Sequence, residues 1–195
     1  MQNIYCKELQ LPDLFVQCYQ DINNTSSLEK VLPISDINIE FRNWLASLNI
    51  GLDNCSRFFS AFPYHKYTLH KDISYASEVS KRITNCVKIN IIYNSRESRM
   101  KWYSLKPDKA PRFIPNKVGE KLRIYKEEDC DVLFETETNG SAYLINGMVI
   151  HTLINGNSTR HCYSMPLVNL TTRVRLTWDE ANAILGPYMS NHQIN

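Results

Sequence analysis

The residues best suited to chemistry are two histidines and an aspartate. His70 and Asp72 lie at the end of the run Tyr64–Leu69, and His151 lies far downstream in Met148–Ile154. Residues two apart on a strand point to the same face, so His70 and Asp72 would place an imidazole beside a carboxylate. Alone they could also be a hydrogen-bonded surface pair. With a second histidine they match the two-histidine, one-carboxylate triad of non-haem iron(II) sites, which leaves coordination positions open.

Arg160 follows His151 nine positions later and is suited to hold an anion beside such a metal. Asn155-Gly156 between two alternating apolar runs predicts a β-hairpin with a two-residue turn. In that register His151 lies opposite Arg160 on one face, although a longer turn would break the pairing. A guanidinium offers a planar, permanently charged fork to a carboxylate. The pattern therefore predicts a ligand with two anionic ends, one on the metal and one on Arg160.

This ordered set resembles the iron(II)/2-oxoglutarate-dependent oxygenases of the double-stranded β-helix fold over about residues 62–168. The segment His151–Asn155 with Arg160 is similar to a stretch of prolyl- and aspartyl/asparaginyl-hydroxylase-like members. The runs Cys86–Tyr93 and Arg99–Tyr103 resemble small members from tailed phages and marine bacteria. The resemblance implies that Arg160 binds the distal carboxylate of 2-oxoglutarate, and that iron(II) is held by His70, Asp72 and His151. It also implies that 2-oxoglutarate and O2 are consumed, with hydroxylation of an amino-acid or peptidyl side chain.

Three more polar side chains are candidates for contact with the cosubstrate. Some family members carry a serine two residues after the arginine; that position is Cys162 here, and Ser164 shares its face by alternation. Asn90 and Lys88 share one face of the predicted strand Cys86–Tyr93, and neither belongs in an apolar core without a partner. Both could line the pocket, but an edge strand facing water would explain them equally well.

Neighbouring residues have structural explanations. Arg160 could pair with Glu135 or Glu137 on the sheet surface instead of with a cosubstrate. His161 alternates with Arg160, so we expect it on the opposite face in a structural role. His65 is expected to be a partly exposed loop residue that could support the metal site from outside.

The elements that would position these residues are mostly strands. From Pro63 onward, short runs rich in Val, Ile, Tyr, Phe and Thr alternate with polar turns, as in a sandwich or barrel. With the resemblance, this predicts a mainly β fold, a double-stranded β-helix (jelly roll) of two antiparallel sheets. The expected strands are Lys66–Asp72, Cys86–Tyr93, Met100–Leu105, Arg112–Ile114, Leu122–Lys126, Val132–Thr138, Ala142–Ile145, Met148–Ile154 and Arg160–Val168.

Helices are expected only near the two ends of the chain. Asp36–Ile50 has helical spacing with Asp36 as its N-cap, and a second helix is predicted at Asp53–Phe62, before Pro63. Thr177–Glu180 is a capping box that opens a helix ending at about Leu185. The predicted organisation is an N-terminal helical extension at 1–62, a jelly-roll core at 63–168, and a C-terminal helix and tail at 169–195.

Composition limits the partners. The 195 residues fit one domain with an extension, and the net charge of +2, without a long basic run, does not indicate nucleic-acid binding. No apolar stretch approaches the roughly eighteen residues of a membrane span. The first residues lack the pattern of a secretory signal. We therefore expect reduced cysteines and a cytoplasmic location, the host cytoplasm if a phage encodes the chain.

Two functions from different classes follow. The first is an oxygenase that acts on an unknown small-molecule or peptide substrate. The alternative is a non-catalytic jelly-roll binding module or viral structural module, because jelly rolls also build lectins and capsids. Convergence of the triad beside Arg160 would favour the oxygenase.

Overall fold

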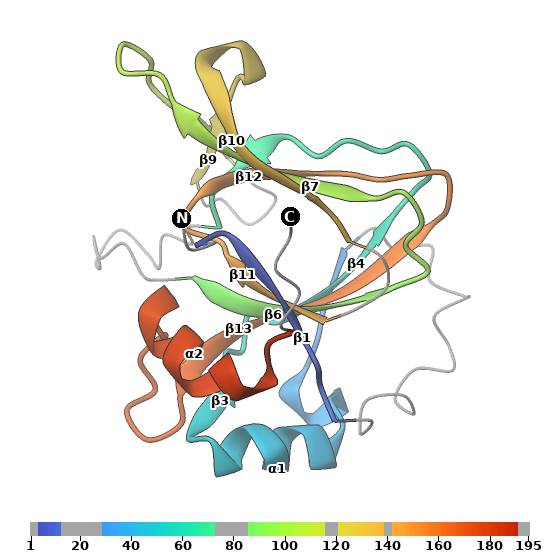
Figure 1. The fold of residues 1–195 in the computed structure, drawn as a ribbon, viewed down its shortest axis with the longest axis vertical. Coiled ribbons are helices and arrows are strands. Elements are labelled where there is room, and N and C mark those ends of the chain that lie inside the picture. The colour runs from blue at the N-terminus through green and yellow to red at the C-terminus, as the bar shows by residue number, and fades with distance from the viewer. Residues whose placement is uncertain (1–3, 13–28, 73–85, 116–120, 139–141, 191–195) are drawn as a thin grey trace.

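In the described part of the chain, two antiparallel sheets form the body of the fold, and two α-helices lie outside one of them (Figure 1). The computed structural model of the chain describes residues 4–12, 29–72, 86–115, 121–138 and 142–190. The fold is mainly β, as the sequence predicted. Helices α1 and α2 are on the side of the larger sheet that faces away from the smaller sheet.

The larger sheet has seven strands. Six form a continuous order, and the short strand β3 (Ile50–Leu52) pairs with the end of the central strand β13. The order is β1 (Cys6–Leu9), β11 (Ala142–Asn146), β6 (Val87–Tyr93), β13 (Arg160–Asn169), β4 (Arg57–Ala61) and β2 (Glu29–Val31).

The smaller sheet has six strands, and a β-bulge interrupts the pairing of one edge strand between Val132 and Phe134. The order is β10 (Cys130–Glu137), β7 (Arg99–Leu105), β12 (Ile150–Ile154), β5 (Leu69–His70), β9 (Lys121–Tyr125) and β8 (Arg112–Pro115).

Eight of these strands form four nested pairs. β4 pairs with β13, β5 with β12, β6 with β11, and β7 with β10, all antiparallel. The first and third pairs lie in the larger sheet and the second and fourth in the smaller one. The chain thus follows the path of one long hairpin wound across both sheets. This winding brings β5 and β12 side by side, although they are far apart in the sequence.

Both faces of the larger sheet are covered. Helices α1 (Ile39–Ser47) and α2 (Trp178–Leu185) bury Phe41 and Leu185, among others, against its outer face. Each such burial contributes roughly 1.5–3 kcal/mol. The β13 residues that pack there alternate along the strand: Tyr163, Met165 and Leu167. Their neighbours in the sequence must therefore face the smaller sheet.

The caps explain where the helices begin. Asn38, and not the predicted Asp36, caps α1: its side chain accepts from the backbone N–H of Glu40 at 2.7 Å and of Phe41 at 3.1 Å. Asp36 instead belongs to a short 3₁₀ helix, Ile34–Asp36. The capping box of α2 is confirmed, and that helix ends at Leu185 as predicted. Two more 3₁₀ helices are Glu127–Asp129 and Gly186–Tyr188.

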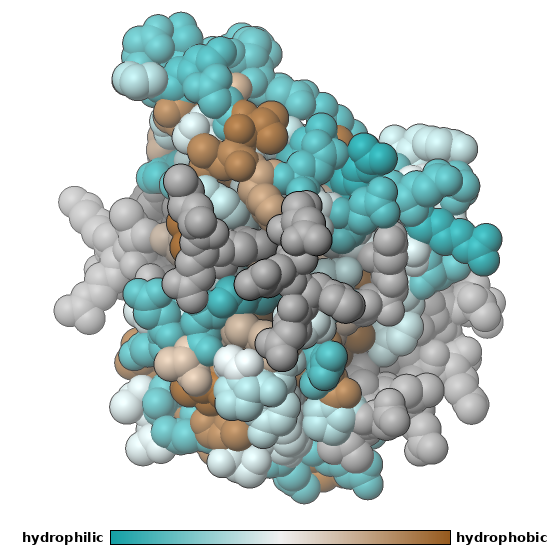
Figure 2. Space-filling view, in the orientation of Figure 1, coloured by the Kyte–Doolittle hydropathy of each residue, from teal (hydrophilic) through white to brown (hydrophobic). Residues whose placement is uncertain are grey.

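Two expectations from the sequence concern membrane spans and the state of the cysteines. No helix in the described part of the chain is long and apolar enough to cross a membrane. The five cysteines among the described residues are free thiols, whereas Cys18 lies outside those residues. Apart from its grey atoms, the face in Figure 2 is mostly hydrophilic, with apolar side chains in small groups.

Eight of the nine predicted strands agree with the structure to within two residues at each end. The strand expected at Lys66–Asp72 is limited to Leu69–His70. The helix predicted at Asp53–Phe62 is wrong, because half of this segment is strand β4, which pairs with β13 and β2, and the other half is not helical. The larger sheet therefore begins before the predicted boundary at residue 63, and the described part of 1–62 is not mainly helical.

The predicted hairpin at Asn155-Gly156 is also wrong. β12 and β13 belong to different sheets, so His151 does not pair with Arg160. The segment 155–159 crosses from the smaller sheet to the larger one. A Cβ at Gly156 would overlap the carbonyl oxygen of Arg96, so the glycine allows a close backbone approach. The Asn-Gly pair thus serves a crossing and not a tight turn.

Candidate metal site

The predicted triad converges on one point. His70 in β5 and His151 in β12 are direct partners in the smaller sheet, with ring centroids 4.7 Å apart. Asp72 follows His70 by two residues, and its carboxylate oxygens face the Nε2 atoms of both rings. Nε2 of His70 lies 3.5 Å from Asp72 Oδ1, and Nε2 of His151 lies 3.4 Å from Asp72 Oδ2. All three potential ligand atoms lie within 4.8 Å of one another.

Backbone carbonyls orient both imidazoles. Nδ1 of His70 lies 2.8 Å from the carbonyl oxygen of Thr68, and Nδ1 of His151 lies 2.9 Å from that of Val149. A carbonyl oxygen only accepts hydrogen bonds, so we infer that each Nδ1 carries a proton, and Nε2 is the nitrogen that each ring turns to the carboxylate. Metal-binding histidines have this arrangement, in which the outer N–H fixes the ring orientation.

The Nε2 atom of His151 faces a carboxylate oxygen without a proton between them. Burial of the His151 imidazole lowers its pKa from 6.5 to about 4, and the attraction of Asp72 does not offset this effect. His151 is therefore neutral at pH 7. Its Nε2 lone pair then lies 3.4 Å from Asp72 Oδ2, so two acceptors face each other without a proton. A metal ion would remove this repulsion.

Asp72 forms a buried ion pair with Lys88. Burial alone would raise the pKa of Asp72, but the Lys88 ammonium and the two imidazoles hold it well below 3.8. Burial alone would lower the pKa of Lys88, and Asp72 raises it instead. Nζ of Lys88 contacts Oδ2, the oxygen that also faces His151. Both groups are therefore charged at neutral pH, and Lys88 is not on a water-facing edge.

Gly147 positions Asp72, and the sequence analysis did not identify it. The backbone N–H of Asp72 donates to the Gly147 carbonyl at 2.9 Å, and the N–H of Gly147 donates to Cys86 at 2.8 Å. A Cβ at Gly147 would lie 2.5 Å from Asp72 Oδ2 and 2.9 Å from Asp72 Cβ. The only available signal was the Asn146-Gly147 pair just before the His151 strand, which says nothing about a contact with Asp72.

The four predicted cosubstrate residues are all buried and come from two adjacent strands of the larger sheet. Lys88 and Asn90 belong to β6, Arg160 and Ser164 belong to β13, and Asn90 is the direct partner of Ser164. Because the alternate β13 residues face the helices, these residues face the smaller sheet. Cys162, between Arg160 and Ser164 on that face, packs with Trp102 and Met100 of the smaller sheet.

His161 lies on the other face of β13, as expected. Its ring stacks on Phe58 with centroids 5.8 Å apart, and its Nδ1 lies 2.9 Å from Ser60 Oγ. His65 is exposed and contacts the edge of the Tyr67 ring. Neither histidine belongs to the triad.

Arg160 is a buried cation without a carboxylate partner among the described residues. Arg160 is only 4% exposed, and its Nε has no hydrogen-bond partner among the described residues. The sheet glutamates considered above, Glu135 and Glu137, pair with Arg99 on the smaller sheet instead. A buried guanidinium without a counter-ion is costly. Arg160 is therefore suited to receive an anion.

Further polar atoms in this space also lack partners. Among the described residues, Oδ1 of Asn90 and Nε1 of Trp102 are buried without a hydrogen bond. Trp102 is the direct neighbour of His151 across β7 and β12. Burial raises the pKa of the Cys162 thiol. The positive charges of Arg160 and Lys88 both lower it, so both cations influence the same thiol. The inner faces of the two sheets thus carry buried cations and polar atoms that lack hydrogen bonds in the described chain.

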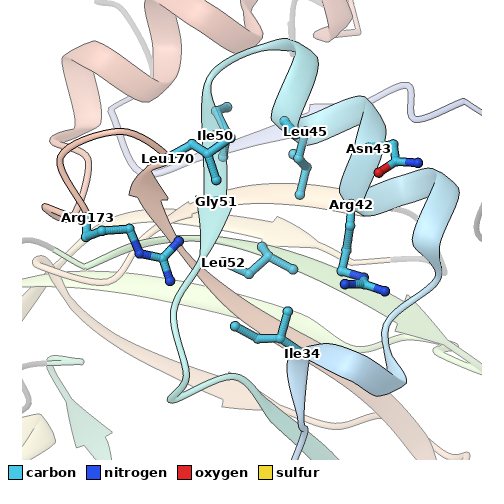
Figure 3. A pocket seen from close by; sticks show the side chains of 10 residues that line it. Ile34, Arg42, Asn43, Leu45, Ile50, Gly51, Leu52, Leu170 and Arg173 are labelled. Atoms are coloured by element: carbon cyan, nitrogen blue, oxygen red, sulfur yellow. The ribbon is translucent and has the colours of Figure 1, made fainter.

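A separate surface pocket of about 250 Å³ lies on the helix side of the larger sheet (Figure 3). Its apolar lining includes Leu45 and Leu52, and Arg42 and Arg173 lie on opposite sides of it. None of the predicted site residues lines this pocket.

No family model matches the chain, and no curated protein shows significant similarity to its sequence.

Proposed function

We propose that this protein is an iron(II)- and 2-oxoglutarate-dependent oxygenase that hydroxylates an amino-acid or peptidyl side chain. The observation that carries the proposal is the arrangement of the triad. Two imidazoles held by backbone carbonyls present their Nε2 atoms to one carboxylate, and the buried His151 is neutral at pH 7. A cation between the bare His151 nitrogen and Asp72 would remove the repulsion between these two acceptors.

The strand connectivity supports a double-stranded β-helix, the jelly roll predicted from the sequence. In the described chain the first and last of the eight strands pair, as do the second and seventh, the third and sixth, and the fourth and fifth. A jelly roll of two Greek keys has this nested pattern. The triad would lie between its two sheets.

The ligand set suits iron(II). Two histidines and a carboxylate with open positions are typical of non-haem iron(II) oxygenases. Ligands at about 2.1 Å and right angles lie roughly 3 Å apart. The nitrogen–oxygen distances of 3.4 and 3.5 Å would need only small side-chain shifts to reach this value. Zinc can use the same donors, so the metal has to be identified by experiment.

Arg160 would hold the cosubstrate. As a buried guanidinium without a carboxylate partner in the described chain, it suits a bidentate pair with the distal carboxylate of 2-oxoglutarate. Ser164 and Asn90 would supply neighbouring polar groups, and Trp102 with Met100 would exclude water. When bound, iron(II) and 2-oxoglutarate supply the chemistry of oxidative decarboxylation with O2, which is coupled to hydroxylation of the substrate.

One observation favours the alternative, a non-catalytic jelly-roll binding or viral structural module. Lys88 already neutralises Asp72, so the carboxylate has a counter-ion without a metal. A purely structural ion pair, however, does not explain two features: the bare Nε2 of His151, and Arg160, which has no carboxylate partner in the described chain.

The test is succinate formation from 2-oxoglutarate with iron(II) and O2, with and without candidate amino acids and peptides. Wild-type protein and a control variant at an exposed histidine, His65→Ala, should form succinate, and His151→Ala should not. Succinate formation that His151→Ala does not reduce, or none from wild-type protein with excess iron(II), would contradict the proposal.

A further inference from the structure

Lys88 and Arg160 are buried on the face of the larger sheet that looks toward the smaller sheet, and Asp72 of the triad lies beside Lys88. Lys88 is 8% exposed and pairs with Asp72, while Arg160 has no carboxylate partner in the described chain. Two positive charges and one negative charge then leave this space with a net charge of +1 before any ligand binds. Most buried charges are balanced by a partner, so this excess is unusual.

A divalent cation at the triad must compete with Lys88 for one oxygen. Nζ of Lys88 contacts Asp72 Oδ2, and the same oxygen faces His151 Nε2 at 3.4 Å. A cation between Oδ2 and His151 would therefore lie next to the ammonium, and charges about 4 Å apart in a protein interior repel strongly. The buried net charge would rise from +1 to +3. A dianion bound at the same time would return it to +1.

We propose that Lys88 makes metal binding and dianion binding depend on each other: it neutralises Asp72 in the metal-free site and turns to the bound dianion when the cation takes the carboxylate. This inference rests on the proposed function, because it assigns Lys88 a role toward the same metal and cosubstrate. Lys88 thus contacts the dianion and is not a metal ligand.

The side chain and its strand suit this movement. β6 is held between β11 and β13, so the backbone at Lys88 is fixed on both sides. Lysine carries a compact charge on a flexible stem of four carbons, which lets the ammonium move while the backbone stays in place. Asn90, two residues along on the same face, is the partner of Ser164, so a short swing keeps Nζ among the predicted cosubstrate residues.

A competing Lys88 and a purely structural Lys88 lead to different changes in metal affinity when the lysine is removed. If Lys88 only held Asp72 in place, its removal would leave metal affinity unchanged or weaker. If Lys88 competes with the cation, its removal strengthens metal binding when no dianion is present. Its removal also weakens the enhancement that a dianion gives, because the cation that received the dianion is lost.

The experiment is a titration with Mn(II), in which paramagnetic resonance measures the free ion, on wild type and Lys88→Met. Each protein is titrated alone, with 2-oxoglutarate, and with glutarate, a dianion without the oxo group that chelates a metal. Couplings between two sites usually amount to about 5- to 150-fold. In wild type, either dianion should raise the Mn(II) affinity roughly tenfold or more. In Lys88→Met, the affinity for Mn(II) alone should rise by a similar factor, and glutarate should change it less than roughly twofold.

Two variants serve as controls. Lys101→Met removes a cation that pairs with Glu135 at 2.9 Å on the smaller sheet and should behave like wild type. Lys88→Arg keeps the charge and should keep weak binding of Mn(II) alone. If Lys88→Met does not fold, Lys88→Gln replaces it, because its amide can still donate to Asp72. The affinity of Lys88→Gln for Mn(II) alone should also rise.

The outcomes separate this inference from the proposed function. Folded Lys88→Met or Lys88→Gln that binds Mn(II) alone no better than wild type would overturn the role of Lys88 and leave the oxygenase proposal in place. Wild-type protein that binds no Mn(II), with or without either dianion, would overturn both.

Discussion

Asn155 connects the two sheets where the chain crosses from β12 to β13, and its removal should strongly destabilise the fold. Its Nδ2 donates to the carbonyl oxygens of Ala61 at 3.1 Å, Phe62 at 2.7 Å and Ser158 at 2.8 Å. Its Oδ1 accepts from Ser98 Oγ at 2.7 Å. The residue thus joins the crossing segment to the end of β4 and to the segment before β7.

The expected loss for Asn155→Ala follows from these bonds. An amide has two N–H groups, so three acceptors share two hydrogens, and the side chain supports about three hydrogen bonds in total. Each contributes about 1 kcal/mol net. Asn155 is only 3% exposed, so water cannot readily replace its side chain. We expect Asn155→Ala to lower the free energy of unfolding by about 3 kcal/mol.

Urea unfolding followed by circular dichroism measures this loss. The matched control is Ser158→Ala in the same segment, which removes one exposed hydrogen bond, from Ser158 Oγ to the Asn94 carbonyl at 2.8 Å. It should cost about 1 kcal/mol or less. A loss for Asn155→Ala no larger than the loss for Ser158→Ala would refute the role of Asn155 in holding the crossing.

Three further predictions concern the site. In the metal-free protein the pKa of His151 is about 4 when folded and 6.5 when unfolded. The unfolded chain gains a proton at His151 at a higher pH than the folded protein does. Lowering the pH from 7 to 4 should therefore lower the free energy of unfolding of wild type by about 3 kcal/mol, and urea titrations of His151→Gln should not show this loss. Arg160→Lys keeps the charge but loses the planar fork, so calorimetry should show at least roughly tenfold weaker 2-oxoglutarate binding, and Arg160→Ala should abolish turnover without weakening metal binding. Gly147→Ala would push a Cβ against Asp72 and should weaken metal binding in equilibrium dialysis, whereas Gly186→Ala, with open space around it, should not. Unchanged pH dependence, 2-oxoglutarate affinity or metal affinity, respectively, would count against each prediction.

The sequence predicted the strands well where alternation and β-branched residues are concentrated. Segments such as Val87–Tyr93 and Arg160–Asn169 have few competing explanations, because their apolar runs are too short for buried helices. The convergence of His70 and Asp72 followed from their spacing, since the side chains two apart share a face. The capping box at Thr177 was readable because its two partners lie three residues apart.

Features that depend on distant partners could not be read from local patterns. Arg57–Ala61 was assigned to a helix, because its pairing with β13 and β2 is invisible in a short window. The Asn155-Gly156 pair has the composition of a tight turn, but the partners of its amide lie in other segments. Lys88 was expected to need a partner, and only the structure identifies that partner as Asp72.

Equilibrium dialysis of the purified protein against iron(II) under anaerobic conditions, with 2-oxoglutarate present, tests the metal site most directly. We expect one bound ion per chain in wild type and in His65→Ala. The ion should be lost in each alanine variant of the triad, at His70, Asp72 and His151. Wild-type protein without a bound ion, or triad variants that keep it, would contradict the metal site on which the oxygenase proposal depends.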